Sequence, residues 1–238
     1  MKPPQGEERT RYVRRMFARI AGRYDLLNRL MTFGQDRAWR TEAIQHLAVQ
    51  PGQRILDAGS GTGDIALQIV HQTPGVRVVA ADLTPEMMAI GRQRPNGERV
   101  AWVVADAQHL PFCDGAFDGV ISGYLLRNVP DVDAALVEQY RVTGDEGRMV
   151  SLDTTPPRRN ILLPFIRFYL KVIIPLLGKL VAGDSEAYTY LPETTAQFLT
   201  AETLAMRIMQ AGYVVDGFVR RMLGSMAIHW GRKTLQKP

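Results

Sequence analysis

The chain has 238 residues, a formal net charge of +5 and a single cysteine, Cys113. Hydrophobic residues make up 46% of it and charged residues 22%, which is typical of a globular protein and excludes collagen-like and wholly disordered chains. One cysteine excludes an internal disulfide, and the scattered histidines offer no pair at the spacing of metal ligands. We therefore expect one domain without a metal site.

The excess of basic residues gives a sequence pI of about 9.5 and predicts attraction to anionic surfaces. Nucleic acid and acidic lipid headgroups both present such surfaces, so charge alone does not choose between them. The longest apolar stretch, residues 161–182, is interrupted by basic residues and prolines, whereas a membrane-spanning helix needs about 20 residues almost free of charge. We therefore expect a cytoplasmic protein.

The first predicted element is a helix over residues 7–24, which is dense in arginine. Four apolar residues between the arginines fall on one helical face: Tyr12, Met16, Phe17 and Ile20. This pattern fits two interpretations, a surface helix with a solvated basic side and a functional lid. A second helix is predicted from Asp36 to about residue 49, before the helix-breaking pair Pro51-Gly52.

From residue 54 onward, short apolar runs alternate with helical stretches of about ten residues. Strands are predicted at 54–58, 76–81, 100–104, 117–121 and 148–152, and helices at 65–72, 85–94 and 131–140. This alternation is typical of a parallel sheet that is covered on both faces. A partly apolar insertion at 158–198 interrupts the pattern. After it we expect a helix from Thr200 to Gly212 and two closing strands, at 213–219 and 225–230.

The strongest local signal is the glycine-rich loop from Leu56 to Asp64, with the sequence LDAGSGTGD. It follows a predicted strand and opens a helix, where backbone N–H groups and the helix dipole favour polar or anionic ligands. A dinucleotide fingerprint would have its third glycine at position 64, where this chain has an aspartate. That departure counts against NAD as the ligand.

Acidic residues lie at the ends of three successive predicted strands, as Asp57, Asp82 and Asp106. A carboxylate after the second strand can accept hydrogen bonds from both hydroxyls of a ribose, and one after the third can lie beside an adenine edge. The alternative is that Asp82 and Asp106 only cap helices. Three acids around one glycine loop favour an adenosine-type ligand.

This combination resembles a class I S-adenosylmethionine-dependent methyltransferase. The resemblance implies an α/β, Rossmann-like fold with a seven-stranded, mostly parallel sheet, an antiparallel closing hairpin and helices on both faces. In that fold the loop binds the methionine part of S-adenosyl-L-methionine, the second acid binds the ribose and the third meets the adenine. The cofactor-binding residues that the resemblance implies are Asp57, Gly59, Gly61, Thr62, Gly63, Asp82, Leu83, Asp106, Ala107 and Gly123.

Further motifs are similar to those of the ubiquinone/menaquinone biosynthesis C-methyltransferase family. They are YDLLN at 24–28, MTFG at 31–34, RAWR at 37–40, LRNV at 126–129, YRV at 140–142, LVA at 180–182 followed by YTYL at 188–191, and AIHWG at 227–231. The family methylates a ring carbon of a polyprenylated hydroquinone. The resemblance therefore implies a C-methyltransferase with demethylmenaquinol as acceptor, or alternatively a ubiquinol precursor.

Several positions depart from the family pattern. Asp36 replaces the usual histidine, Gly123-Tyr124-Leu125 replaces a serine-phenylalanine-glycine, and residues 143–147 replace a Lys-Pro-Gly-Gly turn. The glycine loop is intact. The departures therefore bear on the acceptor, and they motivate a second interpretation, a related methyltransferase for another small apolar molecule.

C-methylation needs a nucleophilic ring carbon, which forms when a hydroquinone hydroxyl loses its proton. A fixed cation beside the phenolate lowers its pKa, so we expect Arg127 with Asn128 to stabilise it and Tyr24 to hydrogen-bond the other ring oxygen. Asp153 and His109 are weaker candidates for the base. The alternative for Arg127 is a surface ion pair with an aspartate of the next helix, and for Tyr24 an ordinary packed aromatic.

The resemblance implies one methyltransferase domain over residues 1–238, with an N-terminal helical lid at about 7–50 and a helical insertion on the substrate side at about 158–198. The family's substrates reside in the bilayer, so we expect the insertion to admit the prenyl tail and residues 9–23 to contact acidic membrane lipid at the periphery. A homodimer is a further expectation. A nucleic-acid-binding methyltransferase-like protein is the alternative from another class, but no aromatic platform lies among the basic residues.

Overall fold

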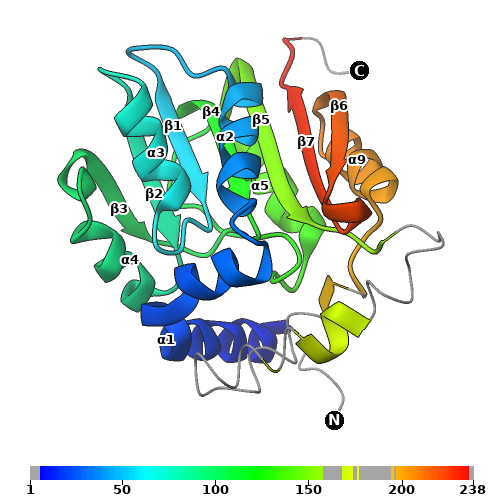
Figure 1. Ribbon diagram of the computed structural model, residues 1–238. Helices are drawn as coiled ribbons and strands as arrows, with labels where there is room; N and C mark the ends of the chain where they lie inside the picture. Colours follow the sequence, from blue (N-terminus) through cyan, green and yellow to red (C-terminus); the bar gives the residue numbers. More distant parts are fainter. Residues whose placement is uncertain (1–5, 158–167, 174–175, 177–193, 196, 236–238) are drawn as a thin grey trace.

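Figure 1 shows the computed structural model, which describes residues 6–157, 168–173, 176, 194–195 and 197–235. Within these residues, seven strands form one sheet in the order β3-β2-β1-β4-β5-β7-β6. The strands are β1 (Arg54–Ala58), β2 (Arg77–Asp82), β3 (Val100–Val104), β4 (Phe117–Gly123), β5 (Thr143–Thr154), β6 (Val214–Arg221) and β7 (Met226–Arg232). The α-helices are α1 (Gly6–Met31), α2 (Asp36–Leu47), α3 (Asp64–Gln72), α4 (Pro85–Arg92), α5 (Val132–Val142) and α9 (Ala201–Gln210). Shorter helical turns are η1 (Gly97–Arg99), η2 (Tyr169–Ile173) and η3 (Met222–Gly224).

Strands β1 to β5 are parallel, and β7 is antiparallel to both of its neighbours, β5 and β6. The predicted fold, including the antiparallel closing hairpin, is confirmed. The chain extends the sheet from β1 through β2 to β3 and then returns to place β4 on the other side of β1. Ligands of open α/β sheets bind at the carboxyl ends of the strands beside such a reversal.

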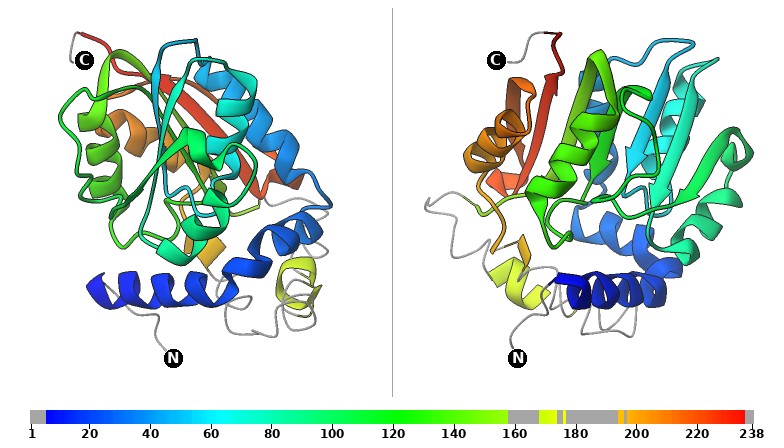
Figure 2. Two further views of the ribbon diagram at one scale, coloured as in Figure 1. Left: turned by 90° about the vertical axis from the view of Figure 1, so that its left-hand side faces the viewer. Right: turned by 180° about the vertical axis from the view of Figure 1, so that it is seen from behind.

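Helices cover both faces of the sheet, as the two views of Figure 2 show. One core cluster joins α2 and α3 to one face of the sheet, and another joins α5 and α9 to the opposite face. Side chains of β1 alternate between the faces, with Ile55 in the cluster on the α2 side and Leu56 in a cluster on the other. Both residues are buried, as expected of a strand in the centre of a doubly covered sheet.

Helix α1 belongs to neither layer and lies across the lower end of the sheet in Figure 1. Met16, Ile20, Leu27 and Met31 form its buried face in a separate cluster. The predicted apolar face is therefore correct, but the helix continues to Met31. Of the two helices in the expected lid region, α1 covers the strand ends, whereas α2 packs on the sheet.

The structure differs from the sequence prediction most clearly at β5. This strand begins at Thr143, where a turn was expected, because Thr143 pairs with Phe117 before the register shifts and Arg148 pairs with Gly119. Glu146 in the intervening bulge has a φ of 59°. Most of the expected insertion at 158–198 lies outside the described residues. No helix among the residues that the structure describes has the length and apolar character of a membrane span.

We expect Ile121→Ala in central strand β4 to lower the free energy of unfolding by about 2–5 kcal/mol, because the fully buried side chain leaves a cavity behind. Val137→Ala is the matched control, since Val137 on α5 is 52% exposed and its truncation should cost less than about 0.5 kcal/mol. Urea denaturation of both variants measures the difference. Equal losses would contradict the packing described for β4.

Candidate active site

A cavity of about 100 Å³ lies between α1 and the carboxyl ends of β1 to β4. Its wall on the α1 side includes Val13, Phe17 and Tyr24. Its opposite wall consists of strand ends and the loops after them, with Gly59, Gly61, Asp82, Leu83, Asp106, Ala107, Gly123, Tyr124, Leu125 and Asn128 among its residues. Helix α1 therefore covers the point in the sheet where a ligand is expected.

A smaller cavity of about 30 Å³ adjoins the first and shares five lining residues with it, Tyr24, Gly59, Gly61, Gly123 and Tyr124. It is also lined by Asp57 and Thr62. The two cavities thus bring together every predicted cofactor-binding residue except Gly63. That each of them contacts the cofactor stays a prediction.

Gly63 shapes the loop rather than lining a cavity. It precedes α3 with a φ of 78°, a conformation that favours glycine. A Cβ at this position would lie 2.3 Å from the indole ring of Trp102. Gly63 therefore allows Trp102 of β3 to pack closely against the loop.

Asp82 and Asp106, at the ends of β2 and β3, accept hydrogen bonds from backbone N–H groups around the larger cavity. The Oδ2 of Asp82 accepts a hydrogen bond from the backbone N–H of Gly61 at 2.8 Å, and its Oδ1 accepts one from Thr84 at 2.7 Å. The Oδ1 of Asp106 accepts from the backbone N–H of Gln108 at 2.9 Å. Carboxylate oxygens have further lone pairs, so these roles leave room for ligand hydroxyls or amines.

Asp57 is the acid whose environment most clearly calls for a ligand. It is 1% exposed, and its Oδ2 accepts a hydrogen bond from the backbone N–H of Ala66 at 3.0 Å. Its buried Oδ1 has no hydrogen-bond partner among the described residues. Burial raises the pKa of Asp57 to about 7. A cationic group in the smaller cavity would both pair with this carboxylate and favour its ionised form.

Tyr24 and Asn128, two of the predicted catalytic residues, line the larger cavity. Burial raises the pKa of the Tyr24 phenol, and the positive charge of Arg127 opposes that rise. The side-chain amide of Asn128 donates to the carbonyl oxygen of Tyr124 at 2.8 Å, while its Oδ1 is buried without a partner in the described part of the chain. Both side chains therefore present polar groups at the cavity.

Arg127 lies behind the cavity wall. It is 7% exposed, lines neither cavity, and its Nη1 lies 3.7 Å from the Oδ1 of Asp153. The ion pair is thus buried and is formed with β5 rather than with the aspartates at the start of α5. Burial raises the pKa of Asp153, which also lines neither cavity. The side chain of His109, the other candidate base, is 84% exposed.

Tyr124 is a site residue that residue-based reasoning missed. The centre of its ring lies 5.5 Å from the guanidinium of Arg127 and 5.7 Å from that of Arg40. Its hydroxyl is buried without a partner among the described residues, and its φ of 59° is unusual for a bulky side chain. The signal in the sequence was its position in a tripeptide that departs from the family pattern.

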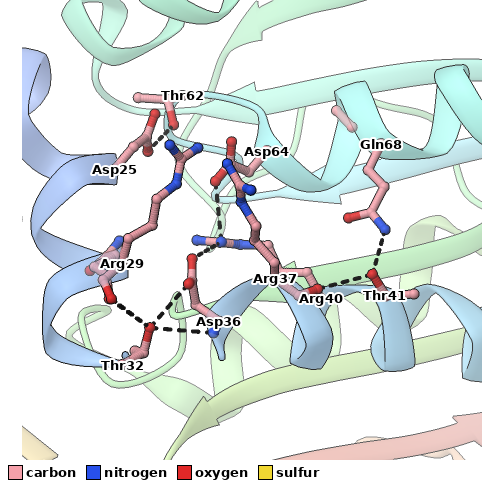
Figure 3. Close-up of polar contacts among 12 residues, drawn as sticks. Asp25, Arg29, Thr32, Asp36, Arg37, Arg40, Thr41, Thr62, Asp64 and Gln68 are labelled. Atoms are coloured by element: carbon pink, nitrogen blue, oxygen red, sulfur yellow. Dashed lines mark hydrogen bonds and ion pairs between the residues drawn. The ribbon is translucent and has the colours of Figure 1, made fainter. Parts of the chain in front are cut away.

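Figure 3 shows a second feature that was missed, a network of charges beside the glycine loop. Arg40 is 5% exposed and forms ion pairs with Asp36 of its own helix and, at 3.2 Å, with Asp64 at the start of α3. The hydroxyl of Thr32 donates to Asp36 at 3.0 Å. The spacing of Asp36 and Arg40, four residues apart on one helix, was the available signal.

Comparison with known proteins gives the identity of this arrangement. The model of the ubiE/COQ5 methyltransferase family matches residues 5–233. The chain belongs to this family. A ubiquinone/menaquinone biosynthesis C-methyltransferase of Desulfotalea psychrophila is 44% identical over 93% of this chain and 90% of that protein. A demethylmenaquinone methyltransferase of Thermus thermophilus is 42% identical over 91% of this chain and 99% of that protein.

Solved structures share the fold at low identity. An S-adenosylmethionine-dependent methyltransferase of Thermotoga maritima has a TM-score of 0.63 at 18% identity, and the match covers 93% of this chain and 100% of that protein. An N-methyltransferase of Haemonchus contortus, solved with S-adenosylhomocysteine, has a TM-score of 0.63 at 16% identity over 83% of this chain and 52% of its own. The family and the fold make this chain an S-adenosylmethionine-dependent methyltransferase.

The buried Asp57 predicts that cofactor affinity depends on pH. The sulfonium and ammonium groups of S-adenosyl-L-methionine are cations, and they are attracted by Asp57 only when it is ionised. Because its raised pKa is about 7, affinity should rise about tenfold between pH 6 and pH 8. Calorimetric titration at both pH values measures the change.

Asp57→Asn should remove most of this pH dependence, whereas the exposed Asp145→Asn should leave it intact. An unchanged pH dependence in Asp57→Asn would show that another group titrates.

Proposed function

We propose that the chain transfers the methyl group of S-adenosyl-L-methionine to a ring carbon of a polyprenylated hydroquinone, with demethylmenaquinol as the acceptor. The observation that supports this most is that Tyr24 and Asn128 border the same cavity as the predicted cofactor-binding residues. Relatives named demethylmenaquinone methyltransferase support the choice of acceptor.

The glycine loop, with Asp57 and Asp82, would hold the cofactor. When bound, S-adenosyl-L-methionine supplies a methyl group to the ring carbon, and the electrons of the broken bond stay on sulfur. The acceptor must lose the proton of its hydroxyl to make that carbon nucleophilic. After the transfer the ring carbon loses its proton and the ring oxygen regains one, so that one proton is released overall. The residues of the chain therefore have to stabilise a phenolate in the larger cavity.

Arg127 can do this through its electric field, without touching the acceptor. Burial raises the pKa of Tyr24, a phenol in the wall of both cavities, and the positive charge of Arg127 opposes that rise. The same charge should favour the ionised form of a hydroquinone bound beside Tyr24. The pairing with Asp153 keeps the guanidinium in place. Tyr24 and Asn128 would then hydrogen-bond the ring oxygens.

A ubiquinol precursor is the second candidate acceptor. The observation that favours it is the printed name of the Desulfotalea psychrophila relative, which covers both ubiquinone and menaquinone biosynthesis. Both acceptors are prenylated hydroquinones, so the proposed roles of the residues are the same for each.

Peripheral contact with acidic membrane lipid is part of the proposal, because both acceptors are lipids. It is supported by the exposed arginines of α1, among them Arg14, Arg15 and Arg23. The cytoplasmic location and the homodimer stay predictions.

A transfer assay with labelled S-adenosyl-L-methionine tests the acceptor. Demethylmenaquinol and a demethylated benzoquinol, each with a short prenyl chain, are offered side by side. We expect label in the naphthoquinol product. Label in the benzoquinol alone would favour the second candidate, and label in neither, despite cofactor binding, would contradict the proposed acceptor class.

Arg127→Gln should lower kcat by about 100- to 1,000-fold, because the stabilisation of the phenolate is lost. It should also shift the rising limb of the pH–rate profile to higher pH, since the acceptor is then deprotonated less readily. Arg99→Gln, at an exposed arginine of η1, is the control and should change neither quantity. A fall in kcat without the shift of the pH profile would mean that Arg127 has a structural role only.

A further inference from the structure

A groove of about 470 Å³ lies outside the two cavities and shares only Arg40 and Asp64 with their linings. We call it the arginine groove, because Arg29, Arg37, Arg40 and Arg94 all line it. Asp64 is the single acidic residue of that lining among the described residues. These side chains come from α1, α2, the start of α3 and the segment after α4, so the groove is built at a junction of elements.

Two of the four arginines are already neutralised within the chain. Arg40 pairs with Asp36 and Asp64, and Arg94 pairs with Asp64 at 2.6 Å and with Asp25 at 3.3 Å. These pairs explain the positions of Arg40 and Arg94 without any ligand.

Among the described residues, the other two arginines of the groove, Arg29 and Arg37, form no ion pair that would account for their positions. The Nε of Arg29 is buried and lacks a hydrogen-bond partner, and no carboxylate in the described part of the chain pairs with Arg29 or with the exposed Arg37. Figure 3 shows both side chains extending toward the region of Asp64. A buried donor without a partner is costly, so an acceptor from a ligand would stabilise this arrangement. The planar guanidinium fork is best matched by a phosphate or carboxylate group.

The surface next to the groove indicates where such a phosphate comes from. Leu26, Leu30 and Phe33, at the end of α1 that contributes Arg29, are 51%, 40% and 73% exposed. Their spacing puts Leu26 and Leu30 on one helical face. Tyr169 stacks on Phe33 at 5.7 Å, and the nearby Val172 is 45% exposed. Exposed apolar side chains beside a basic groove suit the interface of a membrane better than a soluble anion.

We infer that the arginine groove binds the phosphate group of an acidic membrane lipid, with Arg29 and Arg37 as the residues that hold it. Leu26, Leu30 and Phe33 enter the adjoining edge of the acyl layer. The choice of a lipid source rests in part on the proposed function, since a prenylated acceptor reaches the chain from a bilayer.

Binding to phosphatidylcholine vesicles with and without phosphatidylglycerol tests the inference. The double variant Arg29→Gln/Arg37→Gln removes the two unpaired charges of the groove. The control Arg77→Gln/Arg148→Gln removes two exposed charges, of β2 and β5, that line neither cavity nor the groove. We expect the groove variant to bind the acidic vesicles roughly tenfold more weakly than the control, although both have the same net charge.

Equal losses in the two double variants would overturn the inference, because a diffuse basic surface would then explain the binding. Glycerol 1-phosphate, added at constant ionic strength, separates the two sources of phosphate. If it binds to the groove but acidic vesicles do not distinguish the variants, the ligand is soluble and the lipid inference fails.

Turnover of a short-chain quinol keeps the two proposals apart. The groove variant should retain it, because Arg29 and Arg37 line neither cavity. In a second outcome, the unsubstituted chain turns over no quinol while the groove variant still binds acidic vesicles more weakly than the control. In that case the proposed function fails and the inference about the arginine groove is retained.

Discussion

The shape of the site depends on a network of charges that joins α1, α2, the glycine loop and the segment after α4. Arg40 pairs with Asp64, and Asp64 also pairs with Arg94. Arg94 in turn pairs with Asp25 of α1, which accepts a hydrogen bond from the Thr62 hydroxyl at 2.8 Å. Loss of one partner from a buried pair costs about 3–5 kcal/mol, so the pairs around Arg40 hold these elements in one arrangement. The cover formed by α1 is therefore fixed to the loop that it covers.

Much of the fold could be predicted from the sequence because local patterns there agree with the tertiary structure. The apolar runs at β1 and β3 are short enough to be strands and lie next to glycines or turn residues, so their bounds were predicted correctly. The predicted cofactor-binding residues other than Gly63 line two adjoining cavities, because carboxyl ends of parallel strands meet at one edge of a sheet. Gly63 lines neither cavity and packs closely against Trp102, a residue distant in the sequence, so its contact with the cofactor stays a prediction.

The remaining features depend on contacts between distant segments, which no local pattern encodes. Arg127 and Asp153 form a pair only because β4 and β5 are neighbours, and Tyr124 meets Arg40 only because α2 packs over the sheet. The start of β5 was missed for a related reason. Residues at 143–147 have the composition of a turn, but Thr143 still finds a partner in Phe117 across a bulge.

The order of the strands has a consequence for the chain as it is synthesised. Strand β7 is the last strand of the described residues, yet it lies between β5 and β6 rather than at the edge of the sheet. Until β7 leaves the ribosome, the backbone N–H and C=O groups along one side of β5 have no strand to pair with. An unpaired edge of this kind is open to association with other chains. A growing chain that stalls before Met226 would thus expose the unpaired edge of β5 in a sheet of β1 to β5.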